Sequence, residues 1–269
     1  MTFGTGIRKI AVAVLALVLV LLIGPAQAHA VELINIQFQS TGQWNPNAPA
    51  YSGAAVIGSA GDQWNHITDG SGTNFSLSNS TGSVSSTGAT MSWASTGLFG
   101  GYNATPPHTG GDDSNAFGGG TYDALMNSYL YLTADQAPKT ISFKSLAAST
   151  SYDLYVYTEG DNMSAGRNLS ININNNTIRT DHASLSNIGT FVQGENYIKF
   201  TGVTDGSGDL SFTYQGIGSE TVNGKAGEAN INGIQLRQPS GSVPEPSTYV
   251  LMGIGGLLVV LRLKRYSCA

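Results

Sequence analysis

The sequence predicts an all-β protein, an antiparallel β-sandwich of the jelly-roll type that lies between two apolar ends. Three observations predict this fold class. Short runs of alternating apolar and polar residues recur along the middle of the chain, where no apolar pattern with a helical period is sustained. Turn-forming pairs such as Asp69-Gly70 and Asp205-Gly206 separate these runs. Charged residues make up only 11% of the chain, which disfavours solvated amphipathic helices.

The N-terminal end, residues 1–30, has the organisation of a secretory signal peptide. A basic pair that begins at Arg8 precedes an apolar run over residues 10–23, after which a Gly-Pro pair ends the helix. Cleavage after Ala28 or after Ala30 fits the small-x-small rule, and we prefer the second because a strand pattern follows it. An uncleaved anchor is the alternative. We therefore expect export by the Sec machinery.

The middle of the chain, residues 31–238, is long enough for one domain, and residues 239–242 form a short linker. All 17 carboxylates lie between Glu32 and Glu245, whereas 5 of the 12 basic residues lie in the two ends, so the exported part, counted through Glu245, carries about 7 − 17 = −10. A surface of this sign repels phosphate backbones, so we expect no nucleic-acid partner. The single cysteine, Cys268, lies in the tail, which excludes disulfides and thiolate metal sites from the exported part.

Predicted strands fill most of the middle. The run 152–157 shows the pattern best, because Tyr152, Leu154 and Val156 share one face and the intervening residues carry bulk on the other. Such a strand suits the centre of a sheet. The same alternation predicts about twelve strands, at residues 31–38, 54–57, 84–93, 129–132, 140–146, 152–157, 169–173, 177–179, 189–192, 197–200, 210–214 and 229–236.

Two parts of the middle bear on binding. Residues 70–120 are rich in glycine, and we expect long exposed loops there, as an edge insertion or a flexible binding loop. The last predicted strand has an Asn-Gly-Ile-x-Leu ending at residues 232–236. It resembles the closing strand of galactose-binding-like and other carbohydrate-binding sandwiches, which implies a fold like that of a carbohydrate-binding module.

Two short stretches contain candidate binding residues. Residues 61–66 combine Trp64 with Asp62 and Asn65, an aromatic ring beside hydrogen-bonding side chains, which is typical of sugar recognition; a buried core tryptophan is the alternative.

Residues 205–209 place oxygen ligands at alternate positions, on Asp205, Ser207 and Asp209, as calcium loops do. The EF-hand pattern fails, because Leu210 replaces the required glycine. A polar hairpin turn is the alternative to a Ca2+ site.

The sequence indicates no catalytic residues. His66, His108 and His182 are isolated and belong to no metalloprotease or serine-hydrolase motif. The acid pairs Asp112-Asp113 and Glu159/Asp161 have the character of ordinary loop acids. We therefore expect a non-enzymatic protein.

The C-terminal end, residues 243–269, has three parts in a fixed order. The first part consists of Val243, Pro244, Glu245 and Pro246. Its two prolines hold it in an extended conformation. The apolar run 249–261 follows, and as a transmembrane helix it would span roughly 20 Å of a hydrocarbon core of roughly 30 Å. A basic stop closes the chain, formed by Arg262, Lys264 and Arg265, which favours keeping this end in the cytoplasm.

This arrangement resembles the PEP-CTERM sorting signal of Gram-negative bacteria. The resemblance implies that an exosortase recognises the tail at the inner membrane and cleaves it, so residues 243–246 would be substrate residues of another enzyme. An ordinary membrane anchor is the alternative. We expect a protein of the cell surface or extracellular polysaccharide matrix that is structural or glycan-binding. A secreted carbohydrate-active hydrolase or lyase is the rival hypothesis, and an adhesin-like structural protein is a third.

Overall fold

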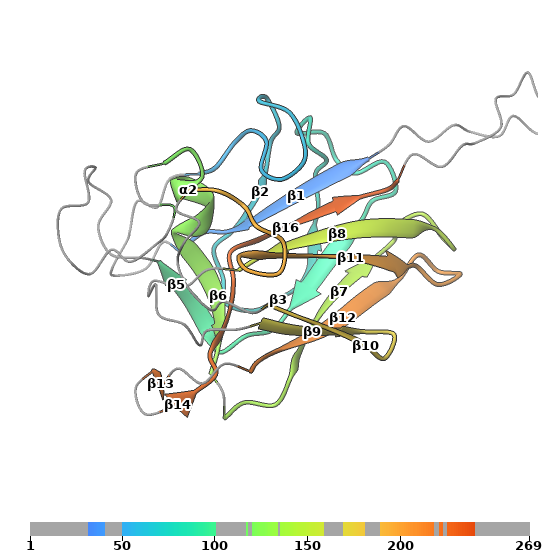
Figure 1. Ribbon diagram of the computed structural model, residues 1–269. Coiled ribbons are helices and arrows are strands. Elements are labelled where there is room, and N and C mark those ends of the chain that lie inside the picture. Colours follow the sequence, from blue (N-terminus) through green and yellow to red (C-terminus); the bar gives the residue numbers. More distant parts are fainter. Residues whose placement is uncertain are drawn as a thin grey trace, which may run out of the picture. The chain divides into compact units, whose positions relative to one another are not determined.

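The computed structural model describes residues 32–40, 50–100, 117, 120–133, 135–158, 169–180, 189–217, 221–222 and 225–239 (Figure 1). The chain divides into two compact units, one of Val31–Pro239 and one that joins Met1–Ala30 with Ser240–Ala269. The predicted signal peptide, linker and C-terminal end, apart from Pro239, lie outside the described residues. Within the described part of the chain, no helix is long and apolar enough to cross a membrane.

The described residues form a nearly all-β structure with two large sheets. A five-stranded sheet has the order β11-β8-β16-β1-β2, with β1 at Leu33–Phe38, β2 at Asn65–Ile67, β8 at Ser151–Tyr157, β11 at Tyr197–Val203 and β16 at Gly233–Arg237. A six-stranded sheet has the order β10-β9-β12-β7-β4-β3, with β3 at Gly72–Ser76, β4 at Thr90–Trp93, β7 at Lys139–Lys144, β9 at Leu169–Ile173, β10 at Asn176–Arg179 and β12 at Leu210–Gly216. Neighbours pair antiparallel, except that β2 pairs parallel to β1.

Smaller elements complete the fold. A three-stranded sheet contains β5 at Gly97–Gly100, β6 at Ser128–Leu132 and β15 at Ala229–Ile231. A two-stranded sheet pairs β13, Thr221–Val222, with β14, Lys225–Ala226, and a short helix, α2, spans Asp123–Met126. In Figure 1, β1 and β16 lie side by side although they come from opposite ends of the described chain.

The main core lies between the two large sheets. One face of each strand supplies it, as strand alternation requires: Leu154 and Val156 of β8 are fully buried there, and so are Ile141 and Phe143 of β7. The predicted central strand is confirmed, because β8 lies between β11 and β16. The antiparallel all-β character of the predicted fold is confirmed as well.

Some predicted strands are wrong. Residues 54–57 form bends instead, because their backbone groups bond to side chains of the sheet: Val56 N donates to Tyr157 Oη at 3.1 Å. Residues 189–192 also form no strand. The predicted strand 229–236 is divided at Asn232, whose Nδ2 donates to Met126 O at 2.7 Å and to Ser128 O at 3.0 Å, so the chain passes from one sheet to another.

A second core covers part of the outer face of the five-stranded sheet. Tyr51 and Trp64 pack there against Leu125 of α2 and Tyr157 of β8. Beneath this layer a polar network joins the sheet to the covering segment: Gln235 Nε2 donates to Asn35 Oδ1 at 2.8 Å and to Ile57 O at 3.1 Å. Because buried polar groups are costly without partners, these bonds fix how residues 50–64 lie on the sheet.

Candidate functional site

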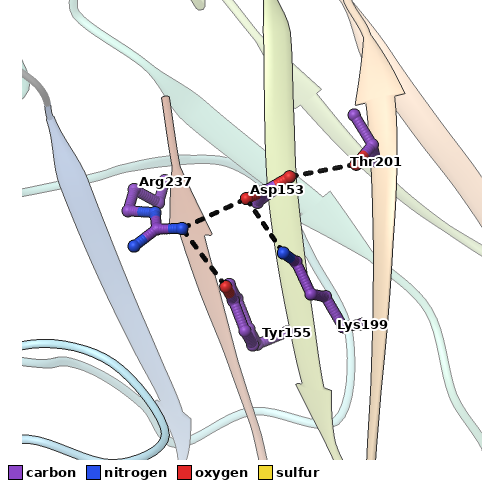
Figure 2. Close-up of polar contacts among 5 residues, drawn as sticks. All are labelled: Asp153, Tyr155, Lys199, Thr201 and Arg237. Carbon is purple, nitrogen blue, oxygen red and sulfur yellow. Dashed lines mark hydrogen bonds and ion pairs between the residues drawn. The ribbon is translucent and has the colours of Figure 1, made fainter. Parts of the chain in front are cut away.

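The rest of that outer face holds a cluster in which two cationic side chains share one carboxylate. We call it the charged face, and it consists of Asp153 and Tyr155 of β8, Lys199 and Thr201 of β11, and Arg237 of β16 (Figure 2). Strand register places them together, since Asp153 is opposite Thr201 on one side and Arg237 on the other, while Tyr155 is opposite Lys199. Residues two apart on a strand share a face, so all five point away from the main core.

Asp153 is the centre of the charged face. Its Oδ1 accepts a hydrogen bond from Thr201 Oγ1 at 3.0 Å. Its Oδ2 lies 3.2 Å from Arg237 Nη2 and 3.3 Å from Lys199 Nζ. The carboxylate side chain is only 12% exposed, whereas the two cationic side chains are each 37% exposed. The cations therefore reach solvent and the carboxylate lies below them.

Two aromatic rings lie next to this ion-pair cluster on the same face of the sheet. Arg237 Nη2 also donates to Tyr155 Oη at 3.3 Å. Lys199 Nζ lies 5.4 Å from the centroid of the Tyr155 ring, within the range of a cation–π contact. Tyr197, two residues before Lys199 on β11, stacks on Tyr155 with centroids 6.4 Å apart and an interplanar angle of 25°. Tyr155 is buried, but Tyr197 remains half-buried.

The electrostatics keep Asp153 and Lys199 ionised near neutral pH. Burial alone would raise the pKa of Asp153, but the bonds from Thr201, Arg237 and Lys199 outweigh it and lower that pKa. The bond to Asp153 raises the pKa of Lys199. Two cations against one carboxylate leave an excess of one positive charge on the face. The face is thus suited to an anion rather than to proton transfer.

Asp153→Asn should lower stability by about 1–2 kcal/mol at neutral pH, because the two cations lose their shared anion while remaining partly screened by solvent. A carboxylate with a lowered folded-state pKa stabilises the fold above its unfolded pKa, and this contribution is lost as the pH falls through the folded value. The difference in unfolding free energy between wild type and variant should therefore shrink as the pH falls below 3.8, the ordinary pKa of an aspartate.

Urea unfolding at a series of pH values measures this difference. Thr201→Val is the matched comparison: it removes one hydroxyl donor to the carboxylate and leaves both ion pairs in place, so it should lower stability less and keep part of the pH dependence. A stability difference between wild type and Asp153→Asn that does not change with pH would contradict the assignment.

Two of the three residues predicted for glycan binding, Trp64 and Asn65, are buried. Trp64 is 6% exposed, and its Nε1 donates to Gly53 O at 2.9 Å. Asn65 is 8% exposed, with its Nδ2 donating to Asn35 O and Ser78 O, both at 2.8 Å. Asp62 Oδ2 accepts the Ser59 N–H at 2.9 Å. The prediction of an exposed platform at Trp64 is therefore corrected, because the ring that would stack on a sugar packs in the second core.

The residues predicted for calcium form a polar turn. Asp205 Oδ1 accepts the backbone N–H groups of Ser207 at 2.8 Å and Asp209 at 2.9 Å, and these bonds lower the pKa of Asp205. Gly208 completes the turn with a φ of 82°. The described residues contain no group of three His, Cys, Asp or Glu side chains that could hold a metal ion. The hairpin-turn alternative accounts for this geometry.

Among the histidines, only His66 lies within the described residues. It is half-buried, burial lowers its pKa, and its Nδ1 lies 2.8 Å from Gln37 Oε1. Since an amide oxygen only accepts, Nδ1 carries the proton. The acids Asp112, Asp113, Glu159 and Asp161 lie outside the described residues.

The sequence analysis did not single out the charged face. The alternation of residues 152–157 placed Asp153 and Tyr155 on one face, but their partners follow only from strand register. A charged residue inside an otherwise apolar or aromatic strand was the available signal, since such a residue needs a partner.

Comparison with known families and structures gives one sequence match. Residues 242–265 match the family described as PEP-CTERM protein-sorting motif. The match includes residues 243–246 and the basic stop, and it confirms the PEP-CTERM sorting motif that the tail predicts. No curated protein matches the chain in sequence.

Similar solved structures are distant and partial. The ANXUR1 extracellular domain from Arabidopsis thaliana is 13% identical, with a TM-score of 0.36, and the match covers 52% of this chain and 38% of that one. A family 35 carbohydrate binding module from Clostridium thermocellum is 15% identical, with a TM-score of 0.24, over 38% of this chain and 72% of that one. The match covers only 38% of the ANXUR1 domain and 33% of another similar structure, the plant receptor-like kinase ANX2.

Proposed function

We propose that this chain, which carries a PEP-CTERM protein-sorting motif at residues 242–265, is a non-enzymatic protein of the cell surface or the extracellular polysaccharide matrix. In this proposal a signal peptide starts export, a short C-terminal helix holds the chain in the inner membrane, and an exosortase removes the tail. The sorting motif is the observation that carries the proposal. The cargo is the β-sandwich, which is structural or binds glycans.

The described chemistry supports a role other than catalysis. Asp153 is held ionised by one hydroxyl and two cations, so it has no proton to give and little tendency to take one. His66 bonds to an amide of the sheet rather than to a nucleophile or an acid. A charged face that presents cations to solvent suits binding better than acid–base work.

Replacing Pro244, Glu245 and Pro246 by alanine should abolish processing, because the extended peptide that the enzyme recognises would be lost. The wild-type protein should be recovered from the culture medium with a C-terminus near residue 245, as measured by mass spectrometry. The variant should remain in the inner membrane with its tail intact. Ser240→Ala, in the preceding linker, is the control and should be processed as the wild type is.

Recovery of the full-length wild-type chain from the cytosol, with both apolar ends present, would contradict the proposed route. Equal processing of the alanine variant would contradict the role of the three residues.

A further inference from the structure

The charged face has unused capacity for an anion. Lys199 and Arg237 are each 37% exposed and share a single carboxylate. An ammonium and a guanidinium together have more N–H donors than the contacts with Asp153 and Tyr155 use. Arg237 Nε is buried, and the other unused donors belong to side chains that reach solvent above Asp153.

An aromatic ring lies on the same face. Tyr197 and Lys199 are two residues apart on β11, so both side chains point outward from the five-stranded sheet. Tyr197 is half-buried, and its ring is held by the stacked ring of Tyr155 and by the neighbouring rings of Tyr157 and Phe191. A ring held in this way can pack against the apolar face of a sugar while a neighbouring cation binds a substituent on that sugar.

We propose that the charged face binds the carboxylate groups of an acidic polysaccharide, with Lys199 and Arg237 as the anion-binding residues and Tyr197 as the sugar-packing residue. This inference rests on the proposed function, because it specifies the glycan that the exported sandwich binds. The exported part as a whole carries about −10, so an acidic polymer is repelled except where cations outnumber carboxylates locally. Binding at the face therefore depends on these two side chains.

A pair of polymers with the same backbone tests the inference. The full-length protein, or its processed form from the medium, is titrated with polygalacturonate and with the same polymer after reduction of its carboxyl groups. Wild type should bind the acidic polymer and bind the reduced polymer at least about 10-fold more weakly, and added salt should weaken the first interaction.

Matched charge-removing variants locate the site. Lys199→Met should weaken binding of polygalacturonate about 10-fold, and the double variant with Arg237→Met should weaken it further. Lys144→Met removes the same charge from an exposed residue of the other large sheet and should leave binding unchanged. Thermal unfolding of each variant separates lost binding from lost folding, and Tyr197→Leu tests the packing role with the charges intact.

Each outcome decides a different statement. Equal binding of both polymers would overturn the carboxylate inference and leave glycan binding intact. Binding of neither would overturn the inference and the glycan-binding part of the proposed function, whereas the sorting route is decided by the C-terminus measured in the medium. Unchanged binding by a folded Lys199→Met/Arg237→Met variant would overturn the location.

Discussion

Gly216→Ala is expected to prevent stable folding, with a loss of about 4 kcal/mol or more in the free energy of unfolding. A Cβ at this position would coincide with the carbonyl oxygen of Gly227 and would lie 2.8 Å from the Ala229 backbone nitrogen. Both obstacles are backbone atoms, which cannot rotate away as a flexible side chain can. The end of β12 approaches the backbone just before and at the start of β15 here, so relief of the clash requires the backbone of residues 227–229 or of the end of β12 to shift.

Chemical denaturation of the variant, or its yield of folded protein where it does not accumulate, measures this effect. Gly206→Ala is the matched control: a Cβ there meets no atom within 4 Å, so its stability should stay within about 0.5 kcal/mol of wild type. A Gly216→Ala protein as stable as the Gly206→Ala protein would contradict the close approach of the two strands.

Local patterning predicted those elements whose own residues decide their conformation. Strand β9 has the predicted bounds, Leu169–Ile173, and its hairpin turn uses Asn174 and Asn175 at φ values of 50° and 63°, a conformation that asparagine tolerates. Strands β3 and β5 were missed because glycine lowers the strand signal. At Gly72 and Gly97 the glycine is needed for another reason, since a Cβ would clash with the rings of Trp93 and Tyr131.

The charged face could not be predicted in the same way, because its members are far apart in sequence. Asp153 and Arg237 are separated by 84 positions and meet only because β16 pairs with β8. A stretch such as residues 61–66 gathers sugar-binding residue types within a few positions, yet Trp64 and Asn65 make their hydrogen bonds inside the protein. Spacing along the chain identifies a site only when that segment alone forms it.

Trp64→Ala is expected to cost about 3–5 kcal/mol in stability and to lower Tm on the order of 10 °C, because it removes a buried ring and leaves a cavity. The Trp64 ring packs edge-on against Tyr51, with centroids 5.2 Å apart, and lies 6.4 Å from Tyr157. It also packs over Gly233 of β16, where a Cβ would lie 3.5 Å from its Cζ3 atom. Its loss removes the anchor by which residues 50–64 lie on the five-stranded sheet.

Calorimetry and glycan titration of the same variant separate the two roles considered for Trp64. A sugar platform would give an unchanged Tm with lost binding, whereas a core anchor gives a large fall in Tm.

Trp64→Phe keeps a ring but leaves Gly53 O without its 2.9 Å donor, so it should cost less, about 1–2 kcal/mol. Val84→Ala, at a side chain that is 72% exposed, is the control and should change stability by no more than about 0.5 kcal/mol. The stability cost should decrease in the order Trp64→Ala, Trp64→Phe, Val84→Ala, because it follows from burial and from one hydrogen bond. A Trp64→Ala protein as stable as the Val84→Ala control would contradict the burial of the Trp64 ring.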